Sequence, residues 1–483
     1  MILLAAIVLP IAAGALLPVF RWSKRGARNA YIMLVTLTTT ALAVIALFSD
    51  LPRLDLLSFN DQLTFSLRLD GIGRVFAGLI ALLWPLTTLY ALDYMRGEEK
   101  ETTFFAFFMM SYGVTLGIAM SANLLTLYIF YEMLSLSTLP LVMHHGDAKS
   151  IAAGLKYLYY SLGGAAFAFI GLVYLVYFGK TTDFMPGGLF QMIGPEHTAQ
   201  LRLGYLLCFF GFSVKAAVFP LHGWLPTASV APTPVTALLH AVAVVKSGVF
   251  AIIRVTYFSF GALVIKGSYA QIIPLSLTAF TIVFGCSMAL KEKHLKRRLA
   301  YSTVSNLSYI LFGALLLSGA GLAAGLMHMV FHALMKISLF LAAGVFNIRG
   351  HAYDVRDLRG IASKLPLICW IFALGSLAMT GIPPLIGFVS KWALAEAAAM
   401  TGGLVPLLGI GALLASAILT GSYLLIPTVM MYSGKRPETA PQTLPVEPGM
   451  RVTLIAISAM VIVLTFYSKP LIDFLTRSAF SLM

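Results

Sequence analysis

The sequence predicts an all-α protein that crosses a membrane many times. Apolar residues make up 59% of its 483 residues, charged residues make up only 11%, and the mean hydropathy is +0.90. A water-soluble domain carries about 25% charged residues, so this composition excludes that class. Apolar runs of about 20 residues, the length that spans a bilayer core of roughly 30 Å, recur along the whole chain. The fold class is therefore that of a polytopic membrane protein.

Apolar runs bounded by charged residues, proline or glycine predict about fourteen transmembrane helices. They are expected at residues 1–20, 30–49, 71–94, 103–121, 123–143, 151–178, 204–220, 233–253, 270–290, 300–319, 321–347, 365–396, 403–432 and 452–468. The eleventh and twelfth runs are long enough to tilt or to break. No positive residue precedes the first run, so we expect a retained helix rather than a cleaved signal.

Basic residues are unequally shared between the loops at the two ends of these helices. Loops after odd-numbered helices carry 19 Lys and Arg residues, whereas loops after even-numbered helices carry 8. Because the more basic loops of a membrane protein face the cytoplasm, both chain termini are expected on the non-cytoplasmic side. The net charge of +14 arises mainly from these loops. It therefore indicates orientation in a lipid bilayer and not a nucleic-acid partner.

Six basic residues lie inside the apolar runs. Arg74 and Lys156 are close to helix starts, where a long side chain can reach the interface. The other four lie several residues from the nearest helix end, and they are Lys215, Lys246, Lys336 and Lys391. A charged group at a helix centre costs on the order of 2.5–3.5 kcal/mol, so such residues normally face a bundle interior or water.

Glu132, in the stretch YEMLSLSTLPLVMHH, is the one acidic residue at the same depth, with Glu396 the closest exception. Four lysines and one glutamate cannot all be paired. At least three lysines must therefore be neutral, hydrated or matched with neutral partners such as histidine, and a lysine that can be neutral can exchange protons. For Glu132 with a single lysine, a static ion pair between two helices is an equal alternative. The full set favours a proton relay.

Histidines accompany the deep lysines. The stretch HMVFHALMK places His328, His332 and Lys336 at i, i+4 and i+8, on one face of a helix. His240 precedes Lys246, and a regular helix would place the two about 240° apart. No third ligand or HExxH motif accompanies the histidine pair, so no metal site is expected. The three cysteines have no paired spacing and predict no disulfide.

Proline interrupts two predicted helices beside deep lysines. In VKAAVFPLHGWLPTASVAPTPV four prolines follow Lys215, and in TGIPPLIGFVSKW a proline pair precedes Lys391. Such breaks free backbone carbonyls, which protein or water must satisfy. The breaks are five helices apart, which predicts two inverted five-helix repeats, helices 4–8 and 9–13, with helices 7 and 12 discontinuous. An ordinary proline kink is the alternative at either site alone.

The repeats divide the chain into four parts. The expected boundaries are 1–101 for three N-terminal helices, 102–258 for the first repeat, 259–433 for the second repeat, and 434–483 for a loop and the last helix.

Several ordered motifs resemble one family of membrane subunits. The stretches are YIFYEMLSLSTLPLV, KAAVFPLHGWLP, APTPVTALLHAVAVVKSGVFAIIR, KRRLAYSTVSNLSYI, HMVFHALMKISLFLAAG and GIPPLIGFVSKW. They resemble the antiporter-like subunits shared by respiratory complex I, membrane-bound hydrogenases and Mrp-type cation/proton antiporters. The resemblance runs from about residue 67 to about residue 396. It implies a polar axis across the membrane middle, whose roles would fall on Glu132, Lys215, Lys246, Lys336 and Lys391.

Two details bear on the subtype. Lys391 differs from the complex I subunit that carries glutamate there, and one further helix pair follows without a long lateral helix. The sequence most resembles the D subunit of Mrp antiporters or its counterpart in hydrogenase-type complexes. One departure is WLPTASVAPTP, which has Thr227 and Ser229 where many members carry an acid and a histidine.

These observations favour a proton-translocating subunit of a multisubunit complex in a bacterial or archaeal cytoplasmic membrane. Other membrane subunits are the expected partners, and Na⁺ is a candidate second ion. We expect no cofactor in this chain, because it has no CxxC, Walker A or glycine fingerprint, although the parent complex could be a redox-driven quinone oxidoreductase or hydrogenase. The alternatives are a self-contained transporter for a small solute and a scaffold with structural charges.

Overall fold

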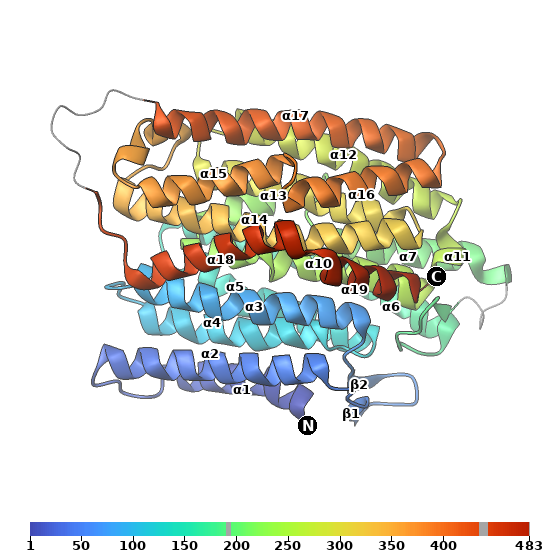
Figure 1. Ribbon diagram of the computed structural model, residues 1–483. Coiled ribbons are helices and arrows are strands. Elements are labelled where there is room, and N and C mark those ends of the chain that lie inside the picture. Colours follow the sequence, from blue (N-terminus) through green and yellow to red (C-terminus); the bar gives the residue numbers. More distant parts are fainter. Residues whose placement is uncertain (190–194, 434–442, 483) are drawn as a thin grey trace.

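The computed structural model describes residues 1–189, 195–433 and 443–482. Its long helices run side by side along one common direction (Figure 1). Within the described residues, ten helical segments are long and apolar enough to cross a membrane. The all-α polytopic fold is therefore confirmed, while the count of fourteen spans stays a prediction. The remaining predicted spans coincide with helices that are shorter, interrupted or more polar.

Three helices and a β-hairpin form the N-terminal part. They are α1 (Ile2–Leu16), α2 (Arg25–Phe48), β1 (Leu54–Ser58), β2 (Thr64–Leu67) and α3 (Gly71–Tyr94). The two strands pair antiparallel. The helices were predicted, but the hairpin was not, because its short strands lie in a stretch that we interpreted as a loop.

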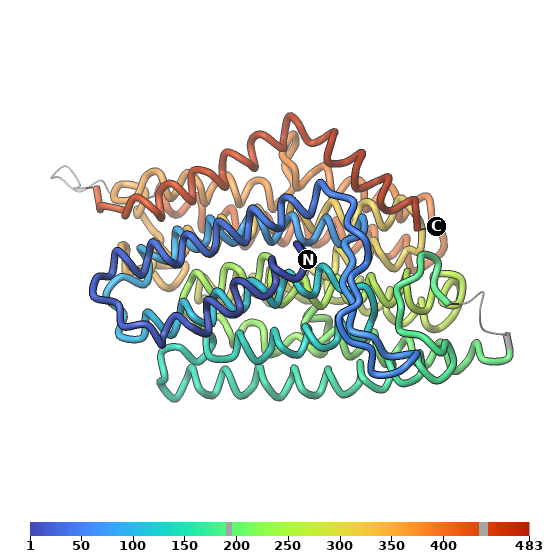
Figure 2. Tube along the Cα trace, turned by 90° about the horizontal axis from the view of Figure 1, so that it is seen from below, coloured from blue at the N-terminus to red at the C-terminus, as the bar shows by residue number. Residues whose placement is uncertain are grey.

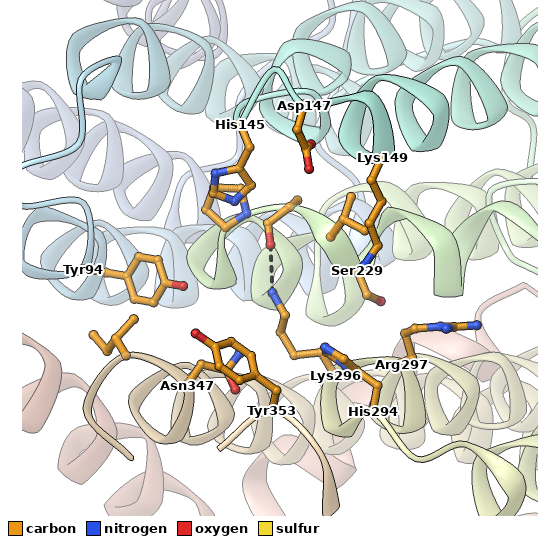
Figure 3. A pocket seen from close by; sticks show the side chains of 14 residues that line it. Tyr94, His145, Asp147, Lys149, Ser229, His294, Lys296, Arg297, Asn347 and Tyr353 are labelled. Carbon is orange, nitrogen blue, oxygen red and sulfur yellow. Dashed lines mark hydrogen bonds between the residues drawn. The ribbon is translucent and has the colours of Figure 1, made fainter. Parts of the chain in front are cut away.

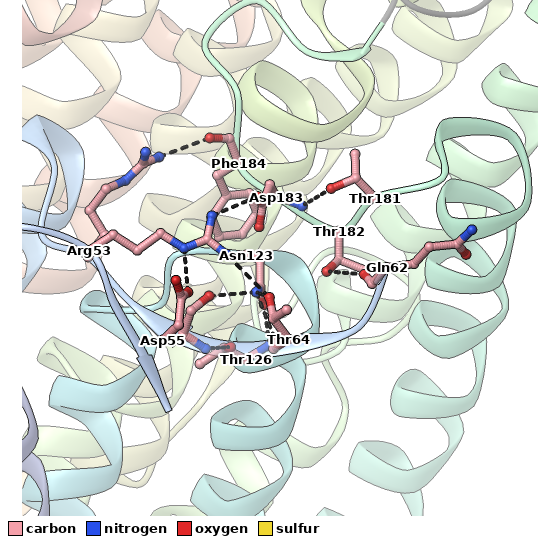
Figure 4. A network of polar contacts seen from close by, with 12 residues as sticks. Arg53, Asp55, Gln62, Thr64, Asn123, Thr126, Thr181, Thr182, Asp183 and Phe184 are labelled. Carbon is pink, nitrogen blue, oxygen red and sulfur yellow. Dashed lines mark hydrogen bonds and ion pairs between the residues drawn. The ribbon is translucent and has the colours of Figure 1, made fainter. Parts of the chain in front are cut away.

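The hairpin is held to one end of the bundle by polar contacts (Figure 4). The side-chain amide of Asn123 donates to the carbonyl of Thr64 at 2.8 Å. Arg53 forms ion pairs with Asp183 at 2.7 Å and with Asp55 at 2.6 Å. These contacts bring together three segments that are far apart in the sequence.

The first predicted repeat begins with long helices and ends with short ones. They are α4 (Glu101–Ala119), α5 (Leu124–Val142), α6 (Ala148–Gly179), η2 (Pro195–His197), α7 (Thr198–Ser213), α8 (Trp224–Thr227), η3 (Ala228–Val230), α9 (Thr233–Ala241), α10 (Val244–Arg254) and the π-helical η4 (Val255–Phe260). Helix α7 ends before Val214, and the next helix, α8, is a single turn. Lys215 therefore lies in the break that the prolines predicted.

The predicted helix at 233–253 is also interrupted, which was not expected from the sequence. Helix α9 ends at Ala241 and α10 begins at Val244. The 240° relation expected between His240 and Lys246 is therefore wrong, because it assumed one regular helix. Neither proline nor glycine marks this interruption.

The second predicted repeat surrounds one long central helix. Its elements are α11 (Ala262–Ile265), α12 (Tyr269–Lys291), α13 (Leu295–Leu315), α14 (Gly319–Gly350), η5 (Val355–Leu358), η6 (Ile361–Ser363), α15 (Pro366–Thr380), α16 (Ile386–Thr401) and α17 (Leu404–Tyr432). Helix α14 is continuous and packs against α9, α13, α15 and α16. The chain breaks between α15 and α16, at the predicted proline pair.

Two further helices close the described chain. Helix α18 (Pro448–Tyr467) is followed directly by α19 (Lys469–Phe480), and Figure 2 shows the bend between them. Helix α19 was not predicted as a separate element, and it packs against α14. Figure 1 shows both termini toward the end of the bundle that carries the hairpin. The expected boundary at residue 434 lies outside the described residues.

Candidate functional site

Helix α14 carries the centre of the site. It is apolar along most of its length, and its most apolar stretch is entirely buried within the bundle. His328, His332 and Lys336 all lie on it and are fully buried. The i, i+4, i+8 spacing thus places three polar side chains in the middle of the protein, where each needs a polar partner.

Two of these groups connect α14 with α10 and α16. Lys246 of α10 lies with its ammonium nitrogen 2.6 Å from Nδ1 of His332. The rings of His332 and His328 stack with centroids 5.9 Å apart. His328 in turn contacts Ser390 of α16, with Nδ1 and Oγ 3.0 Å apart. A line of close polar and ring contacts therefore crosses the protein interior from α10 to α16.

The other side of His328 faces α13. Its Nε2 lies 3.2 Å from Oδ1 of Asn306, and its ring stacks on Tyr309 with centroids 5.0 Å apart. The ammonium of Lys391 lies 5.5 Å from the centroid of the same tyrosine ring. Tyr309 thus lies between the histidine and the lysine of the second broken helix.

Lys391 is held by the break itself. Its ammonium donates to the carbonyls of Met379 and Thr380, at 2.8 Å and 3.0 Å. These are the last carbonyls of α15, which lack helical partners because the chain turns at Gly381. The break at the proline pair therefore leaves backbone carbonyls free to accept hydrogen bonds from a lysine, as expected of a broken membrane helix.

Lys336 points to a different neighbour, α13. It donates to Oγ of Ser302 at 2.8 Å and to the carbonyl of Leu299 at 3.3 Å. The hydroxyl of Tyr423, from α17, donates to the same serine at 2.7 Å. These hydroxyl partners were not predicted, since serine and tyrosine are common in membrane helices and only the fold brings them to the lysine.

Lys215 reaches α5 next to the acidic residue. Its ammonium donates to the carbonyl of Tyr131 and lies 3.4 Å from the centroid of that ring. Gly248 of α10 permits a close approach here, because an added Cβ would lie 2.9 Å from the carbonyl oxygen of Phe212. The first break is thus packed tightly between α5 and α10.

Glu132 lies beside Lys215 without a direct ion pair. It is half-buried, and among the described residues its buried Oε1 has no hydrogen-bond partner. The ammonium of Lys215 lies next to it in the fold, because it contacts Tyr131, the preceding residue of α5. The free Oε1 of Glu132 can take up a proton, or it can accept a hydrogen bond from a donor that moves toward it.

The remaining predicted residues have separate environments. His240 is fully buried and stacks on Phe340, with centroids 4.6 Å apart; within the described chain neither of its ring nitrogens has a hydrogen-bond partner. Lys156 donates to Thr227 at 3.2 Å. Arg74 pairs with Asp50 at 2.7 Å, so it reaches the helix end as expected.

One buried ion pair was not anticipated. Arg254 is fully buried at the end of α10 and donates from Nη2 to Asp70 at 2.7 Å. Asp70 also caps α3 by accepting from the backbone of Gly73. The helix expected at residues 233–253 ends one residue before this arginine, whereas the helical structure continues to Phe260.

Long apolar helices, two of them broken, and a row of lysines and histidines of which all but the partly exposed Lys391 are buried define an antiporter-like membrane subunit. Residues 121–420 match the family described as NADH:quinone oxidoreductase/Mrp antiporter, TM. The chain belongs to this family, and the resemblance drawn from the motifs is confirmed.

Individual relatives agree with this assignment. NADH-quinone oxidoreductase subunit N of Desulforudis audaxviator is 30% identical over 411 residues, which cover 82% of this chain and 80% of that protein. The A subunit of the Na(+)/H(+) antiporter of Alkalihalophilus pseudofirmus is 30% identical over 439 residues, 85% of this chain and 53% of that protein. The chain thus spans about half the length of the second relative.

Among solved structures, the Mrp complex from Dietzia sp. DQ12-45-1b contains a chain with the same fold. The TM-score is 0.87 at 21% identity, and the match covers 99% of this chain and 97% of that one.

Proposed function

We propose that this chain moves protons across the membrane through the row formed by Lys215, Lys246, Lys336 and Lys391, with Glu132 as the charge that controls one end. The observation that carries the proposal is the series of contacts from Lys246 through the stacked histidines to Ser390 and Tyr309. Such a series supports proton transfer, because each group can give and accept a proton or reorient its hydrogen bonds.

The two broken helices hold their lysines on backbone carbonyls rather than on carboxylates. A carbonyl accepts a hydrogen bond from either the charged or the neutral amine, so it holds the lysine in place without fixing its charge. A carboxylate would instead favour the protonated form strongly. This arrangement supports a relay at these two lysines, because an ion-pair clamp there would place a carboxylate directly against each ammonium.

The parent assembly is proposed to be a multisubunit Mrp-type or respiratory complex, in which this chain is the counterpart of the Mrp D subunit or of a hydrogenase-type antiporter-like subunit. Relatives named as Na(+)/H(+) antiporter and NADH-quinone oxidoreductase subunits support an assembly of this kind. The cytoplasmic membrane of a bacterium or archaeon is its proposed location. Both termini would lie on the non-cytoplasmic side, opposite the basic loops.

Proton flux into vesicles that contain the parent complex tests the proposal. Lys215→Ala should reduce flux to the background rate at an unchanged amount of complex in the membrane, because removing a buried lysine costs the fold little. Lys293→Ala is the matched control, since this exposed lysine lies in the loop between α12 and α13. Flux near the parent rate in the Lys215 variant would exclude Lys215 from the relay.

A further inference from the structure

A polar cavity of about 380 Å³ opens at the end of the bundle that carries the basic loops (Figure 3). The loop between α5 and α6, the segment before α9, the start of α13 and the end of α14 surround it. Basic groups outnumber acidic ones in its lining: Lys149, Lys296 and Arg297, together with His145 and His294, face the single carboxylate of Asp147. The proton row proposed above does not include any of these residues.

The positive charges in this cavity are incompletely neutralised. Asp147 lines it and supplies one negative charge, and one of its oxygens accepts a hydrogen bond from the backbone of Ser150 at 2.9 Å. Arg297 is paired with Glu292 at 3.2 Å. Across the described parts of the chain, neither Lys149 nor Lys296 has a carboxylate partner. Two ammonium groups without an ion pair thus share the cavity with the single carboxylate of Asp147, and the lining keeps an excess of positive charge.

The floor of the cavity offers hydrogen-bond donors. Lys296 is only 7% exposed, and its ammonium donates one hydrogen bond to the carbonyl of Ala231, at 2.9 Å. Ser229 is 2% exposed, and its hydroxyl has no partner among the described residues. Burying a hydroxyl without a partner is unfavourable. A hydrogen-bond acceptor bound in the cavity would satisfy the Ser229 hydroxyl.

His294, which also lines the cavity, is a further hydrogen-bond donor. Burial, followed by the charge of Lys296, lowers the pKa of His294. Its Nδ1 is also buried without a hydrogen-bond partner in the described chain. A neutral imidazole can donate from one nitrogen, so it adds a donor to the cavity without adding charge.

We propose that this cavity binds a phosphate-type oxyanion, with Lys149 and Lys296 as its charge partners and the Ser229 hydroxyl as a further donor. Phosphate oxygens only accept hydrogen bonds, and charge-assisted bonds from lysine are among the stronger ones in proteins. The oxyanion is either free phosphate or the head group of an anionic lipid, since basic pockets between membrane helices on the cytoplasmic side accept such head groups.

Binding measurements on the purified parent complex test this proposal. One arm measures equilibrium binding of radiolabelled inorganic phosphate, and the other measures retention of radiolabelled phosphatidylglycerol in micelles of an uncharged detergent. Lys149→Gln and Ser229→Ala are the test variants, because Lys149 is exposed and its replacement leaves the packing intact. Lys293→Gln is the control, since it removes an exposed lysine that does not line the cavity.

We expect saturable binding in one arm, about tenfold weaker in Lys149→Gln, weaker in Ser229→Ala and unchanged in Lys293→Gln. Binding of inorganic phosphate identifies the free anion as the source, and binding only of the lipid identifies a head group. Absence of binding in both arms would overturn the proposal. Equal weakening in Lys149→Gln and Lys293→Gln would also overturn it, because the interaction would then be general surface charge.

Discussion

The ammonium nitrogen of Lys246 lies 2.6 Å from Nδ1 of His332, and both side chains are fully buried. An ammonium cannot accept a hydrogen bond, so the imidazole nitrogen accepts when the lysine is charged. If the proton moves to the histidine, the roles of donor and acceptor reverse. This contact joins α10 to α14, and thereby the two predicted repeats.

Replacing His332 should interrupt the row at this contact. His332→Phe keeps a ring of similar size but offers no acceptor, so we expect proton flux to fall by about a hundredfold or more, the range of a lost general acid–base group. His197→Gln, at a half-exposed histidine outside this series of contacts, should leave flux unchanged. Vesicle flux at matched protein levels measures both, and a Phe variant with normal flux would place His332 outside the path.

The ion pair between the buried Arg254 and the partly exposed Asp70 should stabilise the fold. Asp70→Asn would leave the buried guanidinium without its countercharge, and we expect a loss of about 3 kcal/mol in the free energy of unfolding. Asp50→Asn is the matched control, because the Asp50 side chain that pairs with Arg74 is 99% exposed and such pairs contribute little. Denaturant unfolding in detergent measures the free energy of unfolding of both variants. An equal loss in Asp70→Asn and Asp50→Asn would contradict a stabilising role of the Arg254–Asp70 pair.

His144, just after α5, should make stability depend on pH. Burial, followed by the charges of His145 and Lys100, lowers the pKa of His144 from 6.5 to about 4. The neutral form is therefore favoured in the folded state, and its contribution is complete above about pH 6.5 and lost as the pH falls toward 4. His144→Phe, which fits against Phe104, should flatten the fall of the unfolding temperature in that range.

An unchanged acid-side slope in His144→Phe would assign the pH dependence to other groups. His197→Phe serves as the comparison, because this half-exposed histidine packs against Phe178, at the opposite end of α6 from His144.

The orientation of the chain in the membrane is predicted from the basic loops, and it can be measured directly. The three native cysteines are buried, so a cysteine introduced at an exposed position reports its own side of the membrane. We expect an impermeant maleimide to label Asp61→Cys in intact cells and to label Lys293→Cys only after permeabilisation. The reverse pattern would show that the basic loops face outward and that the predicted topology is inverted.

Composition and local chemistry predicted the membrane fold and the two proline breaks, because each depends on residues close together in the sequence. Each of the four deep lysines has a hydrogen-bond partner in the structure, but the identities of these partners were not predictable. Tyr131, Ser302 and Tyr423 contact lysines or their partners only through tertiary packing. The interruption after Ala241 left no signal in the sequence, since no proline or glycine accompanies it.

The most direct test concerns Glu132, which lies beside Lys215 without pairing to it. If its charge controls whether Lys215 is protonated, removing the charge should trap the neutral lysine. Glu132→Gln keeps the shape and loses the charge, so it should reduce proton flux nearly as much as Glu132→Ala. Glu132→Asp should retain partial flux.

These three variants, assayed for proton flux in vesicles at equal amounts of parent complex, separate a relay from a static helix clamp. In a clamp, glutamine could keep a hydrogen bond and most of the activity, so the order of the variants differs between the two mechanisms. We predict flux near background for Glu132→Gln and Glu132→Ala, and intermediate flux for Glu132→Asp. Flux in Glu132→Gln close to that of the unmodified protein would contradict a role for the Glu132 charge in proton transfer.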